Sequence, residues 1–163
     1  KVNIARKKIK KINNKSKIKS YRIRLDKSNI EKLIKKYDII CDGTDNFETR
    51  FLINDQSLKQ KKVLISAAVS GFEGHIFKFD FRRKTPCYRC FMPEDPGQHN
   101  NCDSLGVTPT ITGIIGTLQA NEVLNSILNF KSNMEKKLIV FNSIKMSFRK
   151  VNLSRNNNCK NKC

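Results

Sequence analysis

Four of the six cysteines in this chain form two close pairs that lie far apart in the sequence. Cys87 and Cys90 are the first pair, and Cys159 and Cys163 are the second, which begins 69 positions later. Thiols at such short spacing can bind one ion together, and two pairs supply the tetrahedral set of soft ligands that suits Zn²⁺. A shared metal would hold the end of the chain against the body of the domain.

The number of cysteines also bears on the cell compartment. Six cysteines in 163 residues are too few for a disulfide-rich secreted scaffold, and their paired spacing is typical of metal ligands in a reducing compartment. The sequence has no apolar run of membrane-spanning length and no signal peptide. We therefore expect a cytoplasmic protein without a membrane partner. The first residue is Lys1 and not methionine, which indicates a partial or processed sequence.

The formal net charge of +19 raises the hypothesis of nucleic-acid binding. The charge is concentrated at the two ends, however. Residues 1–37 hold 15 basic and 2 acidic side chains, residues 131–163 hold 9 and 1, and residues 38–130 hold 9 and 11. The motifs lie in this near-neutral middle, and AT-rich coding produces a lysine excess without selection for a basic surface. A basic zinc-containing nucleic-acid binder is therefore the least favoured reading.

Apolar spacing predicts a single α/β domain in which helices alternate with strands. The expected helices cover residues 2–12, 28–34, 47–58 and 110–130. The expected strands cover residues 18–25, 38–42, 63–69, 75–81, 138–141 and 145–153. This alternation predicts a mainly parallel sheet, made mixed by the last two strands, which read as a hairpin. Residues 82–109 contain all four prolines and read as a loop.

The segment 41–46 (Cys-Asp-Gly-Thr-Asp-Asn) joins an expected strand to an expected helix. Ligands bind beyond the carboxyl ends of strands in open α/β sheets. A carboxylate there can hold Mg²⁺ beside nucleotide phosphates, because hard oxygen ligands suit that ion. The alternative is structural, because Thr-Asp-Asn is also a good helix N-cap. Cys41, inside the strand, is expected to be a small core residue.

Several motifs together resemble the ThiF/MoeB/HesA family, the bacterial relatives of ubiquitin-activating enzymes. Residues 41–46, followed by Arg50 and Asn54, look like the D-x-T-D-N…R…N stretch of that family. The resemblance continues, in the order of the family, through residues 66–74, 86–91, 101–107 and 113–122. It implies a Rossmann-like mixed sheet with flanking helices and a structural zinc clip.

The resemblance also implies an enzymatic reaction. In this family, ATP and Mg²⁺ adenylylate the C-terminal glycine of a ubiquitin-like sulfur-carrier protein that serves thiamine or molybdopterin biosynthesis. The carboxylate attacks the α-phosphorus and pyrophosphate leaves, a reaction that depends on positioning and on neutralisation of charge. A sulfur donor of the desulfurase or rhodanese type is the second partner. Members are usually homodimers, and the helix expected at 110–130 offers apolar surface for such contact.

Five residues receive roles from the resemblance. Asp45 matches the catalytic, Mg²⁺-associated aspartate, and Asn46 lies beside it in the ATP site. Arg50 supports that site, with a helix-surface or ion-pair role as the alternative. Lys1 matches a phosphate-binding lysine, for which a solvated side chain is the alternative. Cys102 matches a catalytic cysteine that forms a thioester or an acyl disulfide with the carrier, against the alternative of an unreactive loop thiol.

The two cysteine pairs match the structural zinc set of the family, which lies away from the nucleotide. The second pair departs from the family pattern, because it is spaced Cys-X-X-X-Cys instead of Cys-X-X-Cys. Free thiols or a degraded site are the alternatives to a Zn²⁺ site formed by all four side chains, Cys87, Cys90, Cys159 and Cys163.

One part of the family pattern is absent from the sequence. The Gly-rich phosphate loop, a ribose-binding acidic residue and an arginine-containing helix precede the equivalent of Lys1, and no G-x-G-x-x-G occurs here. We therefore expect residues 1–163 to be a single ThiF-type nucleotide-binding domain, N-terminally incomplete because its first βαβ unit is absent. A non-catalytic remnant, or a binding module that docks a ubiquitin-like partner, is the alternative to an active enzyme.

Overall fold

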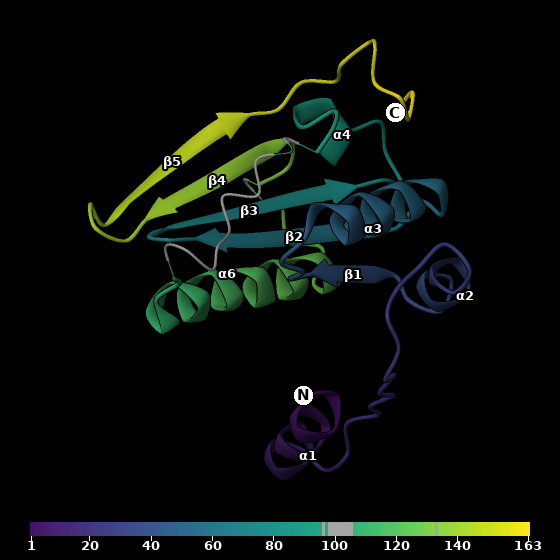
Figure 1. The fold of residues 1–163 in the computed structure, drawn as a ribbon, viewed down its shortest axis with the longest axis vertical. Coiled ribbons are helices and arrows are strands. Elements are labelled where there is room, and N and C mark those ends of the chain that lie inside the picture. Colours follow the sequence, from purple (N-terminus) through teal and green to yellow (C-terminus); the bar gives the residue numbers. More distant parts are fainter. Residues whose placement is uncertain (96, 98–105, 133) are drawn as a thin grey trace.

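The computed structural model describes residues 1–95, 97, 106–132 and 134–163, and these form one five-stranded sheet with helices on both faces (Figure 1). The strands are β1 (Ile39–Asp42), β2 (Val63–Ser70), β3 (Glu73–Asp80), β4 (Lys137–Asn142) and β5 (Ser147–Asn152), and they lie side by side in that order. The helices are α1 (Val2–Ile12), α2 (Ile30–Ile34), α3 (Phe47–Lys59), α4 (Tyr88–Phe91) and α6 (Pro109–Ile127).

The sheet is mixed, as expected, but it is not mainly parallel. Among the described strands, β1 and β2 run parallel, with Ile39 opposite Val63, whereas the other three pairings are antiparallel. β2 and β3 are joined at Gly71-Phe72, and a connection this short can join only antiparallel strands. Gly71 has a φ of +54°, a conformation that glycine adopts without strain. The prediction of a mainly parallel sheet is therefore wrong, because alternating helices and strands do not reveal a turn this short.

Successive side chains of the central strands point to opposite faces and build two core layers. On one face, Leu64 and Phe77 pack with α2, α3 and α4. On the other, Ile65 and Ile76 pack beneath α6, which crosses that face of the sheet in Figure 1. The domain core is therefore a helix–sheet–helix sandwich. Within the described ranges, no helix has the length and apolar character needed to cross a membrane.

The helix predicted at 2–12 is confirmed as α1, but it lies apart from the sheet (Figure 1). Every residue of α1 is exposed except the half-buried Lys10. The strand predicted at 18–25 is wrong, because these residues follow an irregular path. Tyr21, Ile23 and Leu25 instead line a hollow against α2. The apolar alternation there serves packing against a helix and not strand pairing.

The other predicted helices and strands are confirmed with small shifts at their ends, and the 82–109 segment contains the short helix α4. The helix expected from residue 28 begins at Ile30, and its N-cap residue is Asn29. Asp26 accepts the hydrogen bonds of this turn, from the Ser28 amide at 2.8 Å and from its hydroxyl at 2.6 Å.

The position of β1 overturns the expectation for Cys41. β1 is an edge strand in the described part of the chain, and α6 packs over β2 and β3. Cys41 is exposed as a result, although Asp42 beside it is 1% exposed. A compact apolar run predicts a buried strand, but the exposure of each side chain depends on which neighbours cover it.

Candidate nucleotide site and candidate metal centre

The loop after β1 presents Asp45 and Asn46 at the start of α3. Asn46 is the N-cap residue, and its Oδ1 accepts a hydrogen bond from the Thr49 amide at 2.9 Å. Its Nδ2 donates to Oδ1 of Asp45 at 3.2 Å. Both side chains are exposed. Asn46 therefore caps the helix and also orients the neighbouring carboxylate, so the structural and the ligand-binding interpretations of this segment are compatible.

The pKa of the Asp45 carboxyl is lowered from its ordinary value. The hydrogen bond from the Asn46 side chain is the main cause, and the positive charges of Lys1 and Arg50 act in the same direction. Lys1 is exposed and is the N-cap residue of α1. The result is an exposed, ionised carboxylate, which is a hard oxygen ligand of the kind that Mg²⁺ prefers.

Asp42 fixes this loop from the interior. Its Oδ1 accepts hydrogen bonds from the Thr44 amide at 2.9 Å and from the Thr44 hydroxyl at 2.7 Å, and its Oδ2 accepts one from the Ser66 hydroxyl at 2.7 Å. Nε2 of Gln119, on α6, donates to the carbonyl oxygens of Asp42 at 2.9 Å and of Ile65 at 2.8 Å. The loop is thereby tied to β2 and to α6.

Arg50 lies beneath the same loop and is 5% exposed. Its guanidinium donates to the carbonyl oxygen of Thr44 and, at 3.2 Å, to that of Ala67. Its Nε is 3.8 Å from Oδ2 of Asp42. Arg50 is therefore not a helix-surface residue. It forms an ion pair with Asp42 and contacts the backbone of the loop.

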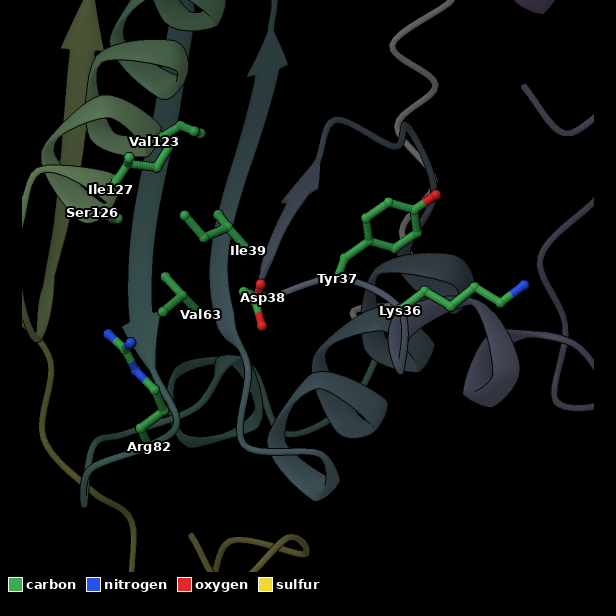
Figure 2. A pocket seen from close by; sticks show the side chains of 9 residues that line it. All are labelled: Lys36, Tyr37, Asp38, Ile39, Val63, Arg82, Val123, Ser126 and Ile127. Carbon is green, nitrogen blue, oxygen red and sulfur yellow. The ribbon is translucent and has the colours of Figure 1, made fainter. Parts of the chain in front are cut away.

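A hollow of 440 Å³ opens at the other end of β1 (Figure 2). Asp38 and Ile39 line it at the start of the strand, and Ile127 contributes from α6. Asp45 follows the end of the same strand, so the hollow and the Asp45 loop lie at opposite ends of β1. Because ligands in open α/β sheets bind beyond the carboxyl ends of strands, the candidate nucleotide site is the Asp45 loop and not this hollow.

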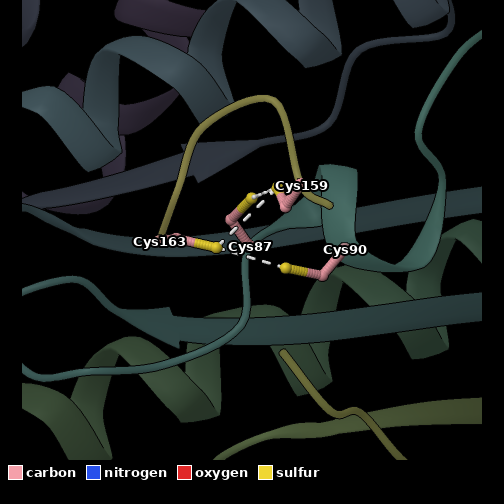
Figure 3. A group of neighbouring side chains, drawn as sticks. All are labelled: Cys87, Cys90, Cys159 and Cys163. Atoms are coloured by element: carbon pink, nitrogen blue, oxygen red, sulfur yellow. Dashed lines mark hydrogen bonds between the residues drawn. The ribbon is translucent and has the colours of Figure 1, made fainter. Parts of the chain in front are cut away.

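The four paired cysteines come together from α4 and the C-terminal tail (Figure 3). Their sulfur atoms all lie within 4.8 Å of one another. The Sγ atoms of Cys87 and Cys159 are 3.7 Å apart, those of Cys90 and Cys163 are 3.1 Å apart, and those of Cys163 and Cys159 are 3.9 Å apart. The departure in spacing of the second pair therefore does not prevent the four side chains from meeting.

This donor set fits a tetrahedral zinc site. Zn–S bonds of about 2.3 Å place tetrahedral sulfur atoms about 3.8 Å apart. The Cys87–Cys159 and Cys159–Cys163 separations of 3.7 and 3.9 Å match this value, and the Cys90–Cys163 separation of 3.1 Å is shorter. Burial, together with neighbouring thiols, raises the pKa of Cys87 to about 11. A metal cation favours the thiolate forms, so binding would release protons from this crowded cluster.

Two residues near the cluster were not singled out from the sequence. Arg89 lies between the first two cysteines, and its Nε donates to Oδ1 of Asp55, on α3, at 2.9 Å. The sequence does show a charged residue inside the Cys-X-X-Cys loop, which indicates a partner of opposite charge nearby. Only the fold identifies that partner as Asp55.

Cys102, the cysteine expected to be catalytic, lies outside the described residues.

The ThiF family model matches residues 1–161 of the chain. The "probable molybdopterin-synthase adenylyltransferase" of Pyropia yezoensis is 37% identical over 156 residues, which are 94% of this chain and 41% of that protein. The "sulfur carrier protein adenylyltransferase" of Thermus thermophilus is 30% identical over 162 residues, covering 96% of this chain and 60% of that protein. The chain thus spans about two fifths to three fifths of the length of these relatives.

Solved structures show the same fold. The crystal structure of E. coli MccB has a TM-score of 0.78 and 16% sequence identity, covering 99% of this chain and 50% of that one. The structure of MccB with AMPCPP and MccA has a TM-score of 0.79 and 15% identity, with the same coverage. At this level of identity, the likeness supports the Rossmann-like mixed sheet and says nothing of the substrate.

Proposed function

Because the chain belongs to the ThiF family, we propose that it is part of an ATP-dependent adenylyltransferase acting on a ubiquitin-like sulfur-carrier protein. The reaction joins the C-terminal glycine carboxylate of the carrier to the α-phosphorus of ATP and releases pyrophosphate. The relatives named as molybdopterin-synthase and sulfur carrier protein adenylyltransferases support this substrate class. Molybdopterin or thiamine biosynthesis would use the product, and the sulfur would come from a desulfurase or rhodanese type of donor.

The observation that carries the proposal is that Asp45 lies beyond the carboxyl end of β1 and accepts a hydrogen bond from Asn46. Asp45 would hold Mg²⁺ beside the phosphates, and Asn46 would orient it. Arg50 would act through the loop backbone, because its guanidinium contacts carbonyl oxygens. Lys1 would add positive charge for the phosphates. Reactions of this kind depend on pre-positioned charge, which this loop supplies.

Pyrophosphate exchange into ATP, measured with the full-length protein and candidate carrier proteins, tests the proposal. We expect exchange that requires a carrier with a C-terminal glycine, and we expect Asp45→Asn to lower its rate about 100-fold or more. Lys59→Ala is the matched control, because Lys59 lies at the far end of α3 and its side chain is 67% exposed. Absence of exchange with every carrier would overturn the proposal. Carrier binding without exchange would instead establish the alternative, a non-catalytic docking module.

Cys102 is proposed to accept the activated carrier, since it matches the cysteine of the family that does so. Its thiolate would attack the acyl carbonyl of the adenylate, forming a thioester and releasing AMP. If the sulfur donor has first transferred sulfane sulfur to Cys102, the outer sulfur of the resulting persulfide would make the same attack, release AMP and form an acyl disulfide. Cys102→Ser should keep pyrophosphate exchange and lose the reducible or thiol-sensitive adduct between protein and carrier. An adduct that persists in this variant would assign the link to another residue.

The free edge of β1 is proposed as the place where the Gly-rich strand and loop of a complete nucleotide site pair with this sheet. The edge position of β1 and the coverage of 41% of one relative support this proposal. Hydrogen exchange of the β1 amides in the full-length protein tests it. Successive amides of a strand point to opposite neighbours, so one of the Ile40 and Cys41 amides faces β2 and the other faces the free edge. We expect slow exchange at both, as for a central strand. Rapid exchange at one of the two would show that the edge stays free.

Zinc binding by the cysteine cluster is proposed as a structural clip that holds the tail to α4. We expect one zinc per chain and its loss in Cys159→Ser. Cys41→Ser is the control, because Cys41 is exposed on β1 and outside the cluster. A metal-free but well-folded protein would overturn the clip.

We propose that the protein forms a homodimer through the end of α6 and the residues that follow it. Leu124, Ile127, Leu128 and Phe130 are large apolar side chains that are 56–63% exposed there. Exposed apolar surface of this kind is typical of protein interfaces. Analytical ultracentrifugation should give a dimer, and Ile127→Glu should shift it to the monomer.

A further inference from the structure

The carboxylate of Asp55 receives hydrogen bonds from both cysteine-bearing loops. Arg89, inside the Cys87–Cys90 loop, contributes Nε at 2.9 Å from Oδ1 and 3.0 Å from Oδ2, and its second donor lies 2.9 Å from Oδ2. Asn161, inside the Cys159–Cys163 loop, donates Nδ2 to Oδ1 at 2.7 Å. One side chain on α3 therefore joins two loops whose nearest residues, Cys90 and Cys159, are 69 positions apart in the sequence.

The Arg89 side of this arrangement is supported by several contacts. The Asp55 side chain is 36% exposed and that of Arg89 is 15% exposed, so the ion pair is partly shielded from water. The Arg89 guanidinium lies 4.3 Å from the centre of the Phe51 ring, and it also donates to the carbonyl oxygen of Pro93 at 3.2 Å. Nδ2 of Asn54 adds another hydrogen bond to Oδ1 of Asp55 at 2.9 Å. A fork-shaped pair with these supports has little freedom to rearrange.

Asn161 makes a second contact that reaches the cluster itself. Its Nδ2 lies 3.6 Å from Sγ of Cys87, within hydrogen-bonding distance for sulfur. Asn161 is the middle residue of the three between Cys159 and Cys163. The middle residue of this longer loop therefore places an amide donor between Asp55 and the Cys87 sulfur.

We propose that Asp55, Arg89 and Asn161, together called the Asp55 anchor, hold both cysteine loops in position for the metal, and that Asn161 donates to the metal-bound sulfur of Cys87. The inference rests on the proposed zinc clip. The anchor orders the loops before the metal binds, which lowers the entropy lost on binding. The N–H donor withdraws charge from the thiolate, which offsets part of the negative charge of four sulfur ligands.

The experiment replaces Asn161 in the full-length protein and measures transfer of zinc to a chromogenic chelator. Partners that orient metal ligands change affinity by about 10- to 100-fold, so Asn161→Ala should weaken zinc binding and speed its release within that range. Asn161→Asp should have a larger effect, because it sets a second carboxylate beside Asp55 and the thiolates. Lys160→Ala is the matched control, since Lys160 is an exposed neighbour in the same loop.

The absorption spectrum of the Co²⁺-substituted protein tests the hydrogen bond to sulfur separately, because a more mobile loop alone does not shift the charge-transfer band in a defined direction. Loss of the N–H donor raises the energy of the sulfur lone pair, so the thiolate-to-Co²⁺ charge-transfer band should move to longer wavelength in Asn161→Ala and stay in place in Lys160→Ala. Circular dichroism confirms that each variant is folded.

The outcomes separate the zinc clip from the anchor. If the wild-type protein binds no metal, the zinc clip itself is overturned. If it binds zinc and Asn161→Ala releases it at the wild-type rate, the anchor alone is overturned. An unmoved cobalt band would overturn the hydrogen bond to sulfur.

Discussion

Arg50 and Asp42 form an ion pair, with Nε 3.8 Å from Oδ2, beneath the loop that carries Asp45. The side chains are 6% and 0% exposed, so both charges are removed from water. Burial of two charges costs several kcal/mol per ion unless other hydrogen bonds satisfy them. The loop supplies these bonds, because Thr44 donates to Asp42 and accepts from Arg50. The shape of the candidate nucleotide site is therefore built into the core of the domain.

Replacement of Arg50 should destabilise the fold as well as the site. Arg50→Met leaves the Asp42 carboxylate buried without a cation, and breaking such a pair costs about 3–5 kcal/mol. Urea unfolding monitored by circular dichroism measures the loss. Lys59→Met is the control, because the Lys59–Glu31 pair is 67% and 60% exposed and such pairs contribute at most about 1 kcal/mol. Equal losses in the two variants would contradict the buried ion pair.

Asn46→Ala should raise the pKa of Asp45. The wild-type value is lowered chiefly by the Asn46 side chain, so its removal moves the pKa toward that of an ordinary aspartate. The variant also loses the N-cap of α3, at about 1 kcal/mol. NMR titration of the carboxyl carbon gives the pKa. Asp26, whose pKa is lowered by Ser28, serves as an internal reference in the same spectra and should not change.

The lowered pKa of Asp45 also determines how the stability of the fold changes with pH. A carboxyl whose pKa is lower in the folded state stabilises the fold at pH values above its unfolded pKa, about 3.9 for aspartate. That contribution is lost as the pH falls through the lowered folded value. As the pH falls from neutral to below both pKa values, the free energy of unfolding of Asn46→Ala should therefore decrease less than that of the wild type. A steeper acid loss in the variant would show that Asn46 does not favour the ionised form.

Two glycine substitutions should have opposite effects. A Cβ at Gly74, on β3, would overlap Cγ1 and Cδ1 of Ile115, which lies on the buried face of α6 and is 2% exposed. Overpacking of this kind costs about 1–3 kcal/mol, so Gly74→Ala should lower the melting temperature. Gly116 has open space around it, and Gly116→Ala should stabilise α6 by up to about 1 kcal/mol through helix propensity. Similar changes in both melting temperatures would contradict this packing.

A buried pair between β3 and α6 should show strong coupling. Nζ of Lys78 is 3.3 Å from Oε2 of Glu122, and both side chains are 6% exposed. Lys78→Met should cost about 3–5 kcal/mol, because it leaves a buried carboxylate without its cation, whereas Lys78→Met combined with Glu122→Leu should recover most of that loss. A double-mutant cycle in urea measures the coupling. Additive losses would show that the two charges act independently.

The local pattern of the sequence predicted most elements because periodicity reports which side of an element is buried. The helix at 47–58 and the strand at 63–69 are found nearly as predicted, the helix from apolar residues at helical spacing and the strand from a continuous apolar run. The strand prediction at 18–25 also rested on apolar spacing, and it was wrong. Such spacing also arises where an irregular segment packs against α2. Motif order was sufficient to indicate the family, which the match to residues 1–161 confirms.

The two cysteine pairs, by their types and spacing, predicted a cluster that joins the tail to the domain, and the four sulfur atoms do lie within 4.8 Å of one another. The identity of the metal and the roles of the nucleotide-site residues stay predictions. Tertiary structure alone decided that Cys41 is exposed at the sheet edge, and that Asn161 reaches Asp55 across 106 positions of sequence. Residue spacing describes one element at a time, whereas such contacts depend on how separate elements pack together.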